Sequence, residues 1–248
     1  NLPTQLTRFV GRVEELAEVS QLLDTQRLIT LAGAGGCGKS RLGVQVAVAV
    51  ADRWPDGVWW IDLGPVTDPA LVAELAASTM RLLVEPVAGP LRALMSQLRQ
   101  ARLLLCLDTC EHVLDASAEL AEALLRSCPG VSVLATSREP LGIAGETVWR
   151  VPSLREEDAV RLFADRAALV RPGFTVESDP DAVSLICRRL DGIPLAIELA
   201  APWTRALTTA QIAAGVDDRF RLLTGGPRGA VARHRTLACE RREVQGVA

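Results

Sequence analysis

The stretch LITLAGAGGCGKSRL, residues 28–42, predicts the fold of the chain around it. Its first part, Leu28–Leu31, is rich in branched apolar side chains and favours a buried strand. The residues from Lys39 to Asp52 favour a helix. Between the two, Gly33–Ser40 matches the pattern G-x-x-x-x-G-K-S. A glycine-rich turn in this place lets backbone N–H groups face phosphate oxygens at the N-terminus of a helix.

The motif assigns individual roles toward ATP or ADP with Mg²⁺. Lys39 is expected to reach the β- and γ-phosphates, and the Ser40 hydroxyl to bind Mg²⁺. Lys39 is also the single lysine among 27 basic residues, and a compact ammonium suits a phosphate in a way that a planar guanidinium does not. The other predicted contacts come from the loop and the start of the helix, at Gly33, Gly35, Gly36, Cys37, Gly38 and Arg41.

Composition limits the class of protein. Hydrophobic residues make up 49% of the 248 residues, which is enough for a full core, and the net charge of −3 argues against a protein that coats nucleic acid. No apolar run is long enough to span a bilayer. The six cysteines lack Cys-x-x-Cys spacing and are expected to be reduced in a cytoplasmic protein.

Two further segments are predicted to contribute to the site. The apolar run Leu103–Leu107 delivers Asp108 to the end of a strand, where it can hold Mg²⁺ through water or simply cap the next turn. Glu111 follows as a candidate base that positions the attacking water, with His112 as an alternative, although both suit an ordinary helix start. Arg138 follows another strand and is expected to read the γ-phosphate; the alternative is a strand cap or a pair with Glu139.

Alternating strands and helices predict an α/β fold with a parallel five-stranded sheet, followed by a small all-helical domain. We expect a P-loop domain over residues 1–152, a helical domain over 153–225, and a linker over 226–248. The expected strands are 28–31, 58–62, 103–107, 131–135 and 147–151. The expected helices are 39–52, 68–80, 91–100, 116–126, 156–170, 180–190, 195–207 and 209–214.

These motifs together resemble the STAND class of signal-transducing ATPases of the NB-ARC type, and more narrowly the ATPase modules of large actinobacterial transcriptional regulators. The resemblance extends from Asn1 to about Leu237. Besides the phosphate loop, it rests on four segments: Phe9–Glu15, Leu103–His112, Leu134–Leu141 and Leu190–Ala200.

The resemblance implies an AAA-like sheet in which the strand before Arg138 lies between the strands of the phosphate loop and of Asp108. It implies a nucleotide buried between the two domains, with Val10, Gly11 and Arg12 near the adenine and Pro194 against the base. It also implies that ADP holds a closed resting state that ATP releases.

The sequence departs from this family in several places. Ser40 replaces the usual Thr and keeps the hydroxyl, whereas Thr109 stands where Asn or Asp is usual, so the match to a hydrolysing site is incomplete. Pro202 is expected to kink a helix that normally continues. The resemblance implies the start of a winged-helix region after Leu237, which would be truncated here, but the residues after Leu237 lack its pattern, so we interpret the chain as a piece of a longer protein.

The leading hypothesis is a regulatory nucleotide switch with slow Mg²⁺-dependent hydrolysis, coupled to flanking output or sensor domains. The alternatives are a P-loop small-molecule kinase and a nucleotide-binding scaffold without turnover. We expect no specific DNA binding by this chain and no membrane partner, and a nucleotide-dependent oligomer is left open.

Overall fold

The computed structural model describes residues 1–85 and 87–216. The linker expected over residues 226–248 lies outside the described residues, as does the last part of the expected helical domain. The chain folds into two compact units. The first unit comprises Asn1–Arg8, Val13–Gly33 and Lys39–Val151, and the second comprises Phe9–Arg12, Ala34–Gly38 and the chain from Pro152 onward.

The first unit contains a five-stranded sheet in which every neighbouring pair is parallel. The strands are β1 Leu28–Ala32, β2 Val58–Asp62, β3 Leu103–Asp108, β4 Val131–Ser137 and β5 Thr147–Arg150. Their order in the sheet is β2-β3-β4-β1-β5, which confirms that the strand before Arg138 lies between the other two motif strands. The three central strands are buried along their whole length, as parallel strands covered on both faces must be.

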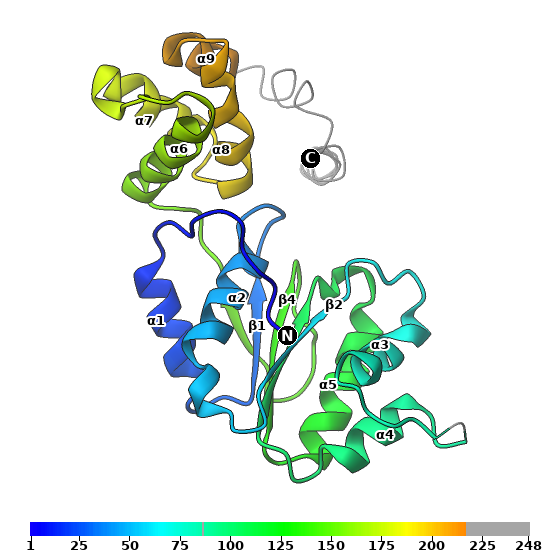
Figure 1. Ribbon diagram of the computed structural model, residues 1–248. Coiled ribbons are helices and arrows are strands. Elements are labelled where there is room, and N and C mark those ends of the chain that lie inside the picture. Colours follow the sequence, from blue (N-terminus) through cyan, green and yellow to red (C-terminus); the bar gives the residue numbers. More distant parts are fainter. Residues whose placement is uncertain (86, 217–248) are drawn as a thin grey trace, which may run out of the picture. The chain divides into compact units, whose positions relative to one another are not determined.

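Helices cover both faces of this sheet (Figure 1). On one side lie α1 Val13–Leu22 and α2 Lys39–Ala49, and on the other lie α3 Val72–Thr79, α4 Pro90–Gln97 and α5 Leu114–Ser127. The apolar core beneath α3, α4 and α5 includes Leu103, Leu105 and Leu107 of β3. Packing of a buried strand against helices therefore fixes the end of β3, where Asp108 lies.

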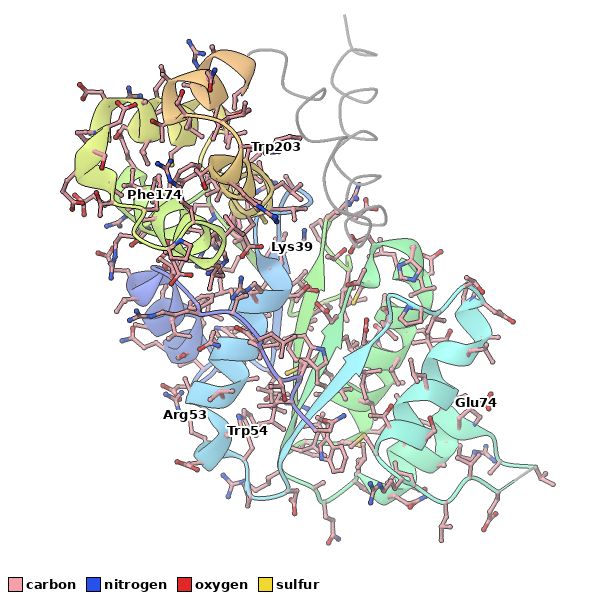
Figure 2. The ribbon with its side chains drawn as sticks, turned by 45° about the horizontal axis from the view of Figure 1, so that its top comes forward. Lys39, Arg53, Trp54, Glu74, Phe174 and Trp203 are labelled. Carbon is pink, nitrogen blue, oxygen red and sulfur yellow. The ribbon has the colours of Figure 1, made fainter. Side chains whose placement is uncertain are left out.

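The helical part of the second unit is formed by α6 Glu156–Val170, α7 Pro180–Arg189, α8 Pro194–Ala200 and α9 Thr209–Val216. Its core contains Phe163, whose ring lies 5.9 Å from that of Phe174 in an edge-to-face arrangement (Figure 2). Asp179 begins α7 by accepting a hydrogen bond from the Ala182 N–H, and Pro180 occupies the first helical position.

The structure corrects several predicted boundaries. Helix α1 is absent from the sequence prediction altogether. Helix α2 ends at Ala49 and not at Asp52, because a separate 3₁₀ turn, η1 Ala51–Arg53, follows it. The predicted helix 195–207 is divided into α8 and the 3₁₀ helix η5 Ala201–Arg205. Pro202 explains this division, because proline has no N–H for the helical hydrogen bond and its ring crowds the preceding turn.

The predicted helix 68–80 also begins differently. A 3₁₀ turn, η2 Pro69–Leu71, precedes α3, and the Asp68 side chain caps it by accepting from the Ala70 N–H at 3.0 Å. Another short 3₁₀ turn, η3 Cys110–His112, separates β3 from α5. The remaining 3₁₀ turn is η4 Val176–Ser178. Among the described residues, no helix is long and apolar enough to cross a membrane.

Candidate functional site

The phosphate-loop motif connects the end of β1 to the first residue of α2. Gly36 and Gly38 have φ angles of 77° and 93°, a region that side chains rarely adopt, so the turn depends on these glycines. Lys39 and Ser40 are the first two residues of α2, where helix N–H groups favour anions (Figure 2). Lys39 is buried, and its ammonium donates to the Gly33 carbonyl at 2.7 Å.

Asp108 lies at the carboxyl end of β3, among polar groups from several elements. The Thr136 hydroxyl of β4 donates to Asp108 Oδ1 at 2.5 Å and accepts from the Thr109 N–H at 2.9 Å. Burial raises the pKa of Asp108, hydrogen bonds from Ser40 and Thr136 lower it, and the charges of Asp62 and Glu111 raise it. The structure therefore brings the predicted metal-binding pair, Ser40 and Asp108, within hydrogen-bonding reach of each other.

Thr136 and Asp62 are functional candidates to which the sequence alone assigns no role. Thr136 belongs to the segment before Arg138, and Asp62 ends a predicted strand. The register of the sheet places Asp62 of β2 opposite Asp108 of β3. Thr136 and Asp62 are both polar residues near the end of a predicted strand, but the strand order is needed to show that each lies beside Asp108.

Glu111 and Arg138 form an ion pair, with Arg138 Nε 3.4 Å from Glu111 Oε1. Arg138 Nε and Glu111 Oε2 are buried atoms without a hydrogen-bond partner among the described residues. His112 Nε2 lies 3.0 Å from the Leu63 carbonyl and 2.8 Å from that of Val66. These contacts give His112 a structural role and leave Glu111 as the better candidate to position water.

Thr109 has a left-handed backbone, with a φ of 65°. A β-branched residue is rare in this conformation, whereas Asn and Asp tolerate it. This geometry gives a physical reason for the Asn or Asp that the resemblance leads one to expect at this position.

Val10, Gly11 and Arg12 belong to the same compact unit as the loop residues Ala34–Gly38. Val10 packs against the helical core. Arg12 is 3% exposed, and one nitrogen of its guanidinium donates to the Cys37 carbonyl at 2.6 Å and to the Pro152 carbonyl at 2.8 Å.

Pro194 lies near the loop as well. A Cβ on Gly38 would be 3.7 Å from Pro194 Cγ, and the next residue, Leu195, donates its N–H to the Gly36 carbonyl at 3.2 Å. A Cβ on Gly36 would come within 2.9 Å of the Leu195 side chain, so glycine is required there for packing as well as for its φ.

Arg41 differs from the other predicted contacts. One of its guanidinium nitrogens donates to the carbonyls of Thr7 and Arg8, at 2.9 and 3.1 Å. These bonds attach the N-terminal segment to α2. The structure thus gives Arg41 a role in anchoring the segment before Val10.

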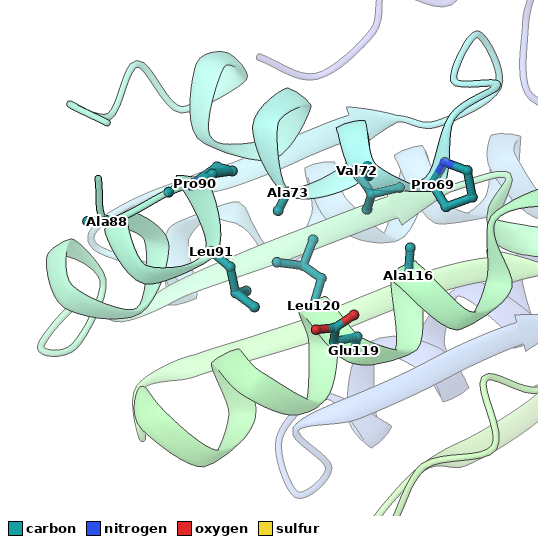
Figure 3. A pocket seen from close by; sticks show the side chains of 11 residues that line it. Pro69, Val72, Ala73, Ala88, Pro90, Leu91, Ala116, Glu119 and Leu120 are labelled. Atoms are coloured by element: carbon teal, nitrogen blue, oxygen red, sulfur yellow. The ribbon is translucent and has the colours of Figure 1, made fainter. Parts of the chain in front are cut away.

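A separate hollow of about 260 Å³ lies between α3, α4 and α5 (Figure 3). Its walls are mostly apolar, with Val72, Leu91 and Leu120 among them, and Glu119 at one side. None of the residues predicted to bind nucleotide or metal lines it.

The chain is similar to segments of two longer bacterial proteins, although no protein-family model matches it. A "Putative HTH-type transcriptional regulator" of Mycobacterium tuberculosis is 51% identical over 218 residues, which are 87% of this chain and 24% of that protein. The "Regulatory protein AfsR" of Streptomyces griseus is 30% identical over 242 residues, which cover 89% of this chain and 24% of that protein. The chain therefore spans about a quarter of the length of these relatives.

The fold is similar to that of a solved STAND protein with a tetratricopeptide-repeat sensor, from Pyrococcus horikoshii. The TM-score is 0.55 at 18% sequence identity, and the match covers 88% of this chain and 33% of that one. At this identity the likeness concerns the fold alone.

Proposed function

We propose that this chain, which shares the fold of a STAND protein and is similar in sequence to bacterial regulators, is a P-loop module that binds ADP or ATP with Mg²⁺ and acts as a regulatory switch. One observation carries the proposal: Lys39 and Ser40 begin α2 directly after the glycine loop, and Asp108 is hydrogen-bonded to Ser40. An ammonium, a hydroxyl and a carboxylate at the carboxyl edge of a parallel sheet match what a magnesium nucleotide requires.

The residues present fit a magnesium ion. Asp108 is a buried carboxylate whose pKa is raised by burial and by the neighbouring acids Asp62 and Glu111. A cation beside it would offset that cost, and hydroxyl and carboxylate oxygens are ligands that Mg²⁺ prefers. We propose that Ser40 and Asp108 hold the ion, which when bound neutralises charge on the phosphates.

Slow hydrolysis is the finer part of the proposal. Glu111 would orient the attacking water, and Arg138 would neutralise charge on the γ-phosphate. Asp108→Asn is then expected to retain much of the ADP affinity but to stop turnover. Phosphate release at the wild-type rate by this variant would remove Asp108 from the metal role.

We also propose that nucleotide state controls other parts of a longer, cytoplasmic protein. The regulator names of the relatives support this role, and so does the fraction of their length that this chain spans. ATP and ADP would act by favouring different conformations of the chain, since a ligand shifts an equilibrium only by its differential affinity for the two states.

The decisive test is Lys39→Ala. Removing the ammonium abolishes a charge-assisted contact worth roughly 1.5–3 kcal/mol, so affinity for both ADP and ATP is expected to fall at least about tenfold. Isothermal titration calorimetry in Mg²⁺ buffer measures both affinities directly.

Arg53→Ala is the matched control, because Arg53 is an exposed residue after α2 that pairs with Asp24 at 2.8 Å. It is expected to leave both affinities unchanged. Equal affinities for wild type and Lys39→Ala would contradict the proposed function.

A further inference from the structure

We propose that Arg12 is a positioning residue for the phosphate loop, acting on the loop backbone and not on the nucleoside. The inference rests on the proposed nucleotide binding. It adds a residue that orients the phosphate loop by binding backbone carbonyl groups. Its basis is the guanidinium nitrogen that donates to both the Cys37 and Pro152 carbonyls.

The bond to Cys37 has a direct consequence for phosphate binding. The peptide between Cys37 and Gly38 is planar and trans, so its carbonyl and its N–H point in opposite directions. When Arg12 holds the Cys37 oxygen on one side, the Gly38 N–H is directed to the other side of the loop. Arg12 thereby fixes the direction of a backbone N–H within the motif whose amides would bind phosphate.

The backbone that carries Arg12 is itself fixed in place. Gly11 and Arg12 have φ angles of 71° and 62°, and an arginine in this region costs about 1–2 kcal/mol. A Cβ on Gly11 would collide with the Asp158 carboxyl group, and the Arg12 N–H points to Asp158 Oδ2 at 3.4 Å. Such a conformation persists only when its surroundings determine it. Here the first turn of α6, which carries Asp158, provides those surroundings.

Burial of the Arg12 guanidinium requires that its hydrogen-bond acceptors come from the protein. Arg12 is 3% exposed, and a buried guanidinium must be compensated by acceptors. Two carbonyls from separate parts of the chain, the loop and Pro152, provide that compensation. Because both acceptors are backbone atoms, the contact is independent of the base and of the number of phosphates.

The test compares Arg12→Ala and Arg12→Lys with wild type by calorimetry, using ADP, ATP and inorganic tripolyphosphate, each with Mg²⁺. A positioning role predicts that Arg12→Ala weakens all three by a similar factor, about tenfold or more. Arg12→Lys retains one cationic donor and is expected to give a smaller loss. Millimolar guanidinium is expected to restore part of the affinity of Arg12→Ala and to leave wild type unchanged.

Arg188→Ala is the matched control, because Arg188 forms an exposed pair with Glu156 in the same unit. It should leave all three affinities unchanged. Loss of ADP and ATP binding with unchanged tripolyphosphate binding would mean that Arg12 contacts the nucleoside, and would overturn the inference. Unchanged affinity of folded Arg12→Ala for all three ligands would overturn it as well. If Lys39→Ala also binds normally, the proposed function itself fails, so the two failures are distinguishable.

Discussion

Asp108 carries a buried carboxylate whose two hydroxyl partners come from different elements, Ser40 of α2 and Thr136 of β4. Two opposing effects act on it. Burial and the nearby acids favour the neutral form, whereas the hydroxyl bonds favour the charged form. The Thr136 hydroxyl also accepts a hydrogen bond from the Thr109 N–H. One side chain therefore positions both the Asp108 carboxylate and the backbone of the residue that follows Asp108. Residues of two other segments thus determine the position of the Asp108 carboxylate.

Arg138 supports a prediction about nucleotide discrimination. Arg138→Ala is expected to reduce ATP affinity by about tenfold and ADP affinity by less, because only ATP has the γ-phosphate that a guanidinium would contact. Glu111 lies 3.4 Å from Arg138, so Glu111→Gln should not reduce ATP affinity, since it removes a competing partner of the guanidinium. Calorimetry with both nucleotides measures the ratio of affinities.

The control for Arg138 is Arg126→Ala. Arg126 pairs with Glu122 on the surface of α5, in the same unit, and its loss should change neither affinity. Equal losses of ATP and ADP affinity in Arg138→Ala would assign Arg138 to structure and not to recognition.

For individual residues, the sequence was sufficient to predict position in a helix or strand where a local motif defines that position. The loop motif predicts that Lys39 and Ser40 begin a helix, and the apolar run predicts that Asp108 ends a strand, as observed. The neighbours of Asp108 were not predictable, because only the strand order places the Thr136 hydroxyl in hydrogen-bond contact with it and Asp62 opposite it on β2. Their roles toward nucleotide and metal stay predictions.

Helices and strands differed in how well their ends could be predicted. The strand 58–62 agrees with the structure, because it is an apolar run between glycines. Helix α1 could not be predicted in the same way: of its ten residues only Val19 and Ser20 are buried, so its apolar pattern is weak. Helix ends depend on capping hydrogen bonds, which are difficult to read from sequence alone.

The end of α3 provides a stability prediction. Arg81 has a φ of 56°, and the bonds Leu82 N–H to Ala77 O and Arg81 N–H to Ser78 O form a Schellman motif. Glycine is the favoured residue at this position. Arg81→Gly is therefore expected to stabilise the fold by about 0.5–1 kcal/mol. Glycine relieves the backbone strain, and the greater entropy of the unfolded chain offsets part of this gain. Urea unfolding followed by circular dichroism measures the change.

Arg81→Ala separates the backbone effect from the loss of the exposed side chain. It keeps the strained conformation and should stay within about 0.5 kcal/mol of wild type. A glycine variant no more stable than the alanine variant would show that the left-handed conformation carries no cost here.

Helix α7 provides a prediction about pH. Burial raises the pKa of the Cys187 thiol to about 12, from a reference value of 9.0, with a smaller effect from Glu156. Between about pH 9 and 12 the unfolded chain therefore binds fewer protons than the folded chain, and the free energy of unfolding falls as pH rises. The slope from one thiol is at most about 1.4 kcal/mol per pH unit. The chain contains no tyrosine and a single lysine, so the other side chains that titrate in this range are mainly the remaining cysteines.

Cys187→Val removes this contribution while keeping an apolar side chain in the core. The test is the difference in unfolding free energy between wild type and Cys187→Val, measured from neutral to alkaline pH, so that the other cysteines cancel. Wild type should lose stability relative to the variant above about pH 9. A difference that does not change with pH would contradict the prediction.

At the scale of the whole molecule, the strand order could be predicted only through the resemblance. Apolar runs alternating with helices predict a parallel sheet, but many strand orders satisfy that pattern. The family motifs implied that β4 lies between β1 and β3, and the order β2-β3-β4-β1-β5 confirms it. Amino-acid composition is most informative about properties of the whole chain, such as its net charge.

The net charge of −3 leads to a prediction about nucleic acid. Binding to duplex DNA depends on neutralising phosphates with basic side chains, and a chain with more acids than bases gains no overall attraction. We therefore predict that residues 1–248 bind DNA only weakly and without sequence preference, although a relative carries the name of an HTH-type regulator. The arginines from Arg228 to Arg242, which lie outside the described residues, provide local positive charge that is expected to give at most salt-sensitive contacts.

Fluorescence anisotropy at physiological salt is the measurement, with duplexes of unrelated sequence compared at the same length. Apparent dissociation constants weaker than about 1 μM, equal for all duplexes and rising steeply with salt, are the expected result, because this is the behaviour of sequence-independent phosphate contacts. A truncation that removes the residues after Val216 is the matched control and should abolish such binding if the arginines cause it. Tight, sequence-selective binding that survives the truncation would place a DNA-reading surface within the sheet or helical unit. The role of nucleotide would then be to control that surface directly and not to act on other domains of a longer protein.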